Sequence, residues 1–134
     1  MGAFPGVLLS QKEAIGTTQM IVWVAREGFI EKNRAAMVDF MEDAVRVVRW
    51  YLDPANHDAA VEIAARLTKQ PPERFAGWLF TDKEYSRSRD LIPNLAALQA
   101  NIEVQRELGF LKGPIDVQKY TDLSLVQEAA ARLK

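Results

Sequence analysis

The hydrophobic positions near the N-terminus predict two short strands. Residues 7–10 and 18–25 are short apolar runs rich in branched side chains, which favour strands. The polar residues 11–16 separate them and end at Gly16. Residues 19–24 are largely apolar at consecutive positions, so both faces of this strand should be covered. Two strands alone cannot supply that cover, because an isolated hairpin is only marginally stable in water.

Beyond Gly28 the hydrophobic positions follow the spacing of helices. The first predicted helix has Asn33 as its N-cap and ends at Asp53, because the residue before Pro54 is disfavoured in helical geometry. Its apolar positions are three, four and seven residues apart, as on one face of a helix. They are Met37, Phe40, Met41, Ala44, Val48, Tyr51 and Leu52.

The rest of the chain predicts four more helices. Residues 56–67 form the second, and Pro71 with Pro72 opens a short third at 73–79. The fourth begins at residue 95 and ends at Gly109, and a capping box of Ser124 and Gln127 starts the last. Their expected inward residues are Ala60, Ile63, Ala64 and Leu67; Leu95, Leu98, Ile102 and Leu108; and Val126, Ala130 and Leu133.

These elements define a mainly α fold class with a small two-strand β element. We expect residues 1–134 to form a single partial domain, with the strands in about 7–25 and the helical region in about 29–134. A chain of this length can bury roughly two thirds of the surface that it exposes when unfolded. It therefore needs no disulfide or metal to remain folded.

Composition and charge remove several classes of function. The 17 Lys and Arg residues balance 18 Asp and Glu residues, so nucleic-acid binding is disfavoured. The absence of cysteine excludes disulfides, zinc–thiolate sites and thiol nucleophiles. The uncharged run at residues 14–25 is well short of the ~20 apolar residues that span a bilayer. The N-terminus lacks a basic region before its apolar stretch, so it does not resemble an intact secretory signal.

The sequence contains no strong catalytic signal. His57 is the single histidine, and it falls at an expected helix start with no serine or cysteine motif beside it. Glu42 and Asp43 fit a solvated helix face better than an acid–base pair. Recognisable nucleotide, calcium and zinc-protease motifs are also missing. We therefore predict no catalytic residue, no metal ligand and no cofactor.

Two places offer side chains for a small ligand. Thr17, Thr18 and Gln19 bring hydroxyl and amide groups to the start of the second expected strand, although turn capping explains them equally well. Trp78 flanks the polar stretch 81–90, where its ring can line a pocket, although most large aromatic rings belong to a core. We take these four residues as the candidate ligand-binding residues.

Four runs of residues, in this order and spacing, resemble a known family. They are FIEKN at 29–33, WYLDPAN at 50–56, LQ at 98–99 and ELGFL at 107–111. Together they are similar to the C-terminal part of the solute-binding proteins of ABC importers, in the branch for nitrate, sulfonate, taurine and thiamine-precursor ligands. The resemblance extends from about residue 9 to residue 134.

The resemblance implies a fold, a function and a location. Family members are periplasmic and have two α/β lobes, the type II fold of periplasmic binding proteins, which close on a ligand and deliver it to an ABC permease. This chain would be a C-terminal fragment of that fold, with Thr17, Thr18 and Gln19 close to the cleft. The expected function is to bind a small organic anion or nitrogen compound for transport.

Two alternatives and one expectation about assembly remain. The same fold family includes thiamine-pyrimidine synthases that use histidine chemistry, and the chain can also be a small helical interaction protein without a ligand. Apolar surfaces in residues 20–24 and on the helices require cover, because large exposed apolar patches are uncommon on monomers. We therefore predict a homodimer or a higher oligomer, with strand exchange as one form.

Overall fold

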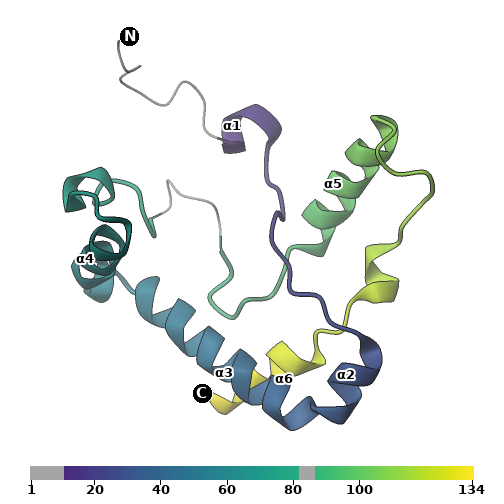
Figure 1. Cartoon of the computed structure of the whole chain (residues 1–134), viewed down its shortest axis with the longest axis horizontal. Coiled ribbons are helices and arrows are strands. Elements are labelled where there is room, and N and C mark those ends of the chain that lie inside the picture. Colours follow the sequence, from purple (N-terminus) through teal and green to yellow (C-terminus); the bar gives the residue numbers. More distant parts are fainter. Residues whose placement is uncertain (1–10, 82–86) are drawn as a thin grey trace. The chain divides into compact units, whose positions relative to one another are not determined.

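A computed structural model describes residues 11–81 and 87–134. Every regular element in these residues is a helix, and Figure 1 shows them in chain order. The α-helices are α1 (Gln11–Ile15), α2 (Glu27–Lys32), α3 (Arg34–Tyr51), α4 (His57–Thr68), α5 (Leu95–Glu107) and α6 (Ser124–Arg132). Three short 3-10 helices complete the set: η1 (Pro54–Asn56), η2 (Pro72–Arg74) and η3 (Val117–Tyr120).

The predicted two-strand β element is wrong. Residues 18–26 contain no strand, residues 11–15 form α1 instead of a polar connection, and residues 7–10 lie outside the described part of the chain. A strand needs the backbone of a neighbouring strand to bond with, and the described residues offer none. The high β-propensity of residues 18–25 was therefore not enough to form a strand. Across the described ranges the chain is all-helical, which also corrects the expected fragment of an α/β fold.

The chain divides into two compact units. Of the described residues, the first unit combines those up to Val22 with Asn94–Thr121, and the second combines those of Trp23–Pro93 with Asp122–Lys134. The first unit therefore contains α1, α5 and η3, and the second contains the remaining helices. Residues 20–24 include the point where the chain leaves the first unit and enters the second.

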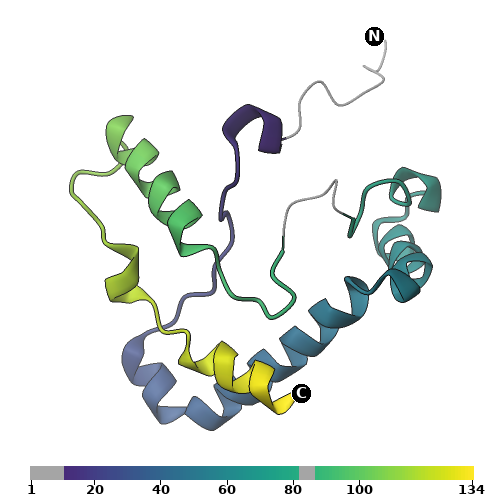
Figure 2. The ribbon, with the colours of Figure 1, turned by 180° about the vertical axis from the view of Figure 1, so that it is seen from behind.

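The core of the second unit lies between α3 and α6. Val38 on α3 and Leu125 and Ala129 on α6 are almost completely buried, and partly buried residues of α2 and α3 pack around them. Figures 1 and 2 show the two helices side by side from opposite directions. Ala129 is 0% exposed, so its small side chain allows the two helices to approach closely. Burial of these apolar side chains is the main force that joins the helices.

Ion pairs line the edges of this interface. Arg34 on α3 donates to Ser124 Oγ and to Glu128 on α6, over 3.1 Å and 3.0 Å. In the opposite sense, Arg132 on α6 donates to Asp39 on α3 over 2.9 Å. These side chains are substantially exposed, so each pair contributes little energy by itself. Their effect is geometric: each ion pair joins a particular residue of α3 to one of α6, so together they fix how α6 lies along α3.

The junction between α3 and α4 confirms the predicted helix stop. Helix α3 ends at Tyr51, and the Asp53 carboxylate accepts a hydrogen bond from Ala55 N at the start of η1. Asn56 Nδ2 donates to Trp50 O over 3.0 Å, which closes the turn. Helix α4 exists as predicted, but its buried face was misassigned. Ala60 is buried as expected together with Val61 and Ala65, whereas Ile63 is 39% and Leu67 is 75% exposed.

Helix α5 of the first unit begins at the predicted residue and ends at the predicted glycine. Asn94 Oδ1 accepts from Ala97 N at the start. At the end, Gly109 has a φ of +81°, Gly109 N donates to Arg106 O, and Phe110 N donates to Gln105 O. This is the Schellman pattern, which glycine favours because it has no Cβ to clash in left-handed geometry.

Two other predicted helix starts are corrected. The expected helix at 73–79 is reduced to η2, followed by turns up to Phe80. At α6, the expected capping box of Ser124 and Gln127 does not form at the N-cap position. Asp122 Oδ1 instead accepts from Ser124 N over 2.8 Å. A carboxylate in this place satisfies a helix N–H that has no partner within the helix.

Candidate functional site

Gln19 uses its polar groups to hold the first unit together. Its Oε1 accepts from Asn94 N over 2.9 Å, at the start of α5, and its backbone carbonyl accepts from Asn101 Nδ2 over 3.0 Å. Its Nε2 donates to Ile21 O over 2.8 Å. These bonds join two parts of the chain that are far apart in sequence. Gln19 therefore positions its segment against α5, and its amide is already occupied.

Thr17 and Thr18 have different surroundings. Thr18 is the buried polar side chain of the described core, with 8% exposure, whereas Thr17 is exposed. Burial of the Thr18 hydroxyl limits what it can offer to a ligand from solution. Of the three consecutive candidates, Thr17 is the one whose side chain faces solvent.

Trp78 belongs to the second unit, so the structure does not place the four candidates in one compact unit. Its indole Nε1 donates to Arg74 O over 2.6 Å, and its ring centre lies 6.3 Å from that of Phe75. The side chain remains 44% exposed. The ring is therefore fixed at one edge while part of its surface is accessible.

A second aromatic group lies near the end of α3, and the sequence reasoning did not assemble it. The rings of Tyr51 and Phe80 are 4.4 Å apart, and the Arg87 guanidinium lies 5.9 Å from the centre of the Tyr51 ring. Arg87 Nη1 is also 3.5 Å from Tyr51 Oη, at the limit of a hydrogen bond. The arrangement combines a tilted ring pair with a cation over one face. Phe80, just before the polar stretch, and Tyr51, near the end of the predicted long helix, were the signal available in the sequence.

His57 lies at the first residue of α4, as predicted. Its Nε2 is 3.0 Å from Ala76 O, so the ring bonds a backbone carbonyl in the turns after η2. A carbonyl oxygen can only accept, which places a proton on Nε2 in this bond. The bond links α4 to the turns that follow η2, and it uses the Nε2 nitrogen of the ring.

An open depression of about 450 Å³ lies in the first unit, between α5 and the segment before and within η3. Gln99 organises it, because its Nε2 donates to Ile115 O and its Oε1 accepts from Val117 N. Glu103 pairs with Arg106, whose hydrogen bond, together with that from Gln99, lowers the pKa of the Glu103 carboxyl. The lining residues are Leu95, Ala96, Gln99, Glu103, Pro114, Ile115, Asp116, Val117 and Gln118. Because its main polar groups already bond one another, the depression offers few of them to a ligand.

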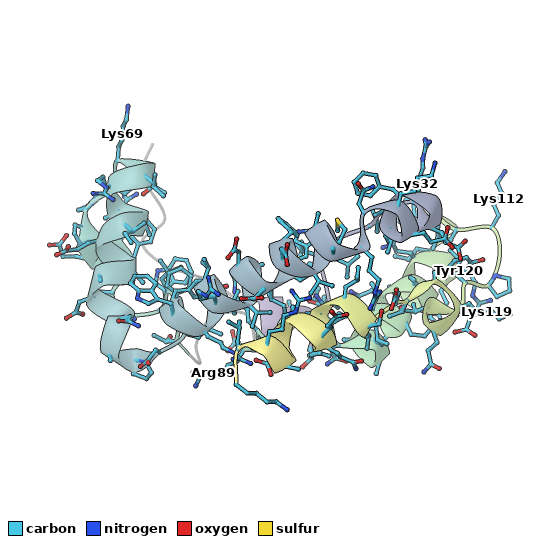
Figure 3. All side chains as sticks on the ribbon, turned by 90° about the horizontal axis from the view of Figure 1, so that it is seen from below. Lys32, Lys69, Arg89, Lys112, Lys119 and Tyr120 are labelled. Carbon is cyan, nitrogen blue, oxygen red and sulfur yellow. The ribbon has the colours of Figure 1, made fainter. Side chains whose placement is uncertain are left out.

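Figure 3 shows Lys32 at the end of α2 and Lys69 at the end of α4 extending away from the ribbon. Within residues 11–81 and 87–134, no group of three or more histidine, aspartate or glutamate side chains is placed to hold a metal ion. No helix in those same ranges combines the length and the apolar character needed to cross a bilayer.

Comparison with known protein families, with curated proteins and with solved structures gave no match.

Proposed function

We propose that the chain is the C-terminal part of the substrate-binding protein of an ABC importer. Its cargo would be a small organic anion or nitrogen compound of the nitrate, sulfonate, taurine or pyrimidine-precursor class. In the full-length protein it would act in the periplasm and deliver the ligand to the permease. The proposal depends on the ordered sequence runs, and one structural observation supports it: these runs fix the ends of the helices.

The run at 50–56 is the clearest case. It contains the last residues of α3, the capping Asp53 and the whole of η1. Asn56 returns to bond Trp50 O, so the first and last residues of the run are joined directly. A sequence run with this role is constrained as a unit, because loss of either end removes a hydrogen bond that stops or starts a helix. Its resemblance is therefore more informative than that of a surface run of equal length.

The other runs have similar roles. Residues 29–33 end α2, where Asn33 Nδ2 donates to Phe29 O over 2.8 Å. Residues 107–111 contain the left-handed Gly109 that ends α5. Residue Gln99 bonds both Ile115 and Val117, which holds η3 beside α5. The residues that carry the resemblance therefore lie where a helix ends or where one element is held beside another.

The contacts described above refine which side chains would meet a ligand. Gln19 positions its segment, and Thr18 is buried, so two separate binding candidates remain, Thr17 in the first unit and Trp78 in the second. An exposed hydroxyl can donate to a sulfonate or nitrate oxygen. A partly exposed indole ring can cover the apolar part of an organic ligand.

A thermal-shift screen with nitrate, taurine, an alkanesulfonate and an aminopyrimidine tests this proposal. A ligand that binds only the folded chain raises Tm by mass action, and a concentration one hundred times Kd adds about 2.7 kcal/mol to the free energy of unfolding. We expect a saturable shift with one class. No shift with any of the four at millimolar concentration, in a chain whose circular dichroism is helical, contradicts the proposal.

Tryptophan fluorescence then tests the contact with Trp78. The responding ligand should change the emission of the wild type, and Trp78→Phe should abolish that change. Trp50→Phe is the matched control, because Trp50 is similarly exposed, at 40%, but lies near the end of α3. Equal loss of the signal in both variants would remove Trp78 from the site.

The second candidate function is a helical interaction protein without a small ligand. It is favoured by the number of large apolar side chains that the second unit leaves exposed, with Leu67 at 75% as an example. A chain that fails the ligand screen while forming a defined oligomer supports this alternative.

A further inference from the structure

We draw no further inference here: the strongest candidate, the exposed apolar surface patch of the second unit in which Trp23 packs on Phe40 and Val47 lies two turns further along α3, carries no proposal because nothing in the described part of the structure shows what covers it.

Discussion

Arg49 joins three parts of the second unit through one guanidinium. Its Nε and Nη2 reach Asp90 Oδ1 over 2.8 Å and 2.7 Å, and Nη1 donates to Leu133 O over 3.0 Å. The side chain is 28% exposed, so these bonds are partly shielded from water. Arg49 also donates to Ala130 O, which binds α3 to the end of α6. A planar fork with several donors suits this task, whereas a lysine offers one point charge.

We expect Arg49→Ala to lower the free energy of unfolding by about 1.5–3 kcal/mol, the usual range for hydrogen bonds to a charged group. Urea unfolding followed by circular dichroism measures it. Arg46→Ala is the control, because Arg46 is 59% exposed and pairs only within α3, with Glu42 and Asp43. Arg46→Ala should lower the free energy of unfolding by about 0.3–0.5 kcal/mol. Equal effects would show that Arg49 does not join the elements.

Asp122 should make stability depend on pH. Hydrogen bonds from the Ser124 hydroxyl, and then from the Ser124 N–H, lower the pKa of this carboxyl below its ordinary value. A lowered folded-state pKa gives stability that is present above the unfolded pKa of about 3.9 and is lost as pH falls through the folded value. Asp122→Ala should therefore be about 0.5–1 kcal/mol less stable than the wild type at pH 7.

The same comparison at acidic pH provides the check. As pH falls through the lowered folded-state pKa of Asp122, the wild-type carboxyl becomes protonated, so the difference between wild type and Asp122→Ala should shrink. Urea titrations of the two proteins at pH 7, 4 and 2.5 measure this difference in the free energy of unfolding. A difference that stays constant with pH would mean that the carboxylate charge plays no part.

At the scale of the elements, the turn after α5 depends on one glycine. Gly109 has a φ of +81°, and a Cβ placed there would meet nothing within 4 Å. Gly109→Ala should therefore cost about 1 kcal/mol through backbone strain and not through a clash. The fall in Tm measures it. Gly28→Ala is the control: Gly28 lies in α2 with equally open space and no positive φ, so alanine should be neutral or slightly stabilising.

The helix ends could be predicted because their signals are local. Asp53 before Pro54 and Gly109 after α5 act within a few residues of the helix that they end, so the sequence alone contains the information. The buried faces are different. Leu67 fits a helical apolar stripe but is 75% exposed, whereas Val61 and Ala65 on the same helix are buried. Which face is buried depends on the partner element, which periodicity does not specify.

The expected strand and the role of Gln19 failed for a related reason. Residues 18–25 have strand-forming side chains, but a strand also requires a partner backbone that the described chain lacks. The partners of Gln19, Asn94 and Asn101, lie 75 and 82 residues away in the sequence. Its amide looked available for a ligand because those contacts exist only in the folded chain.

At the scale of the whole molecule, the two units differ in how much apolar surface they bury. Among the described residues, the buried hydrophobic side chains of the first unit are Ala97 and Val117, whereas the second buries those of α3, α4 and α6. The free energy needed to open a segment of the folded chain rises with the apolar contact that the segment buries. We expect amides of α3 to exchange with deuterium at least ten times more slowly than those of α5. Mass spectrometry of labelled peptides measures this, and equal rates would contradict it.

The open connection at residues 20–24 makes the chain a substrate for proteolysis. Proteases prefer exposed backbone outside regular structure, and chymotrypsin cuts after large aromatic residues. Trp23 and Phe110, each more than half exposed, meet both conditions, whereas Tyr120 is exposed but lies within η3. Limited digestion should therefore cut first after residues 23 and 110. Early cuts at these two places, with the helices still protected, would show that the lifetime of the chain is set by its connections and not by its helices.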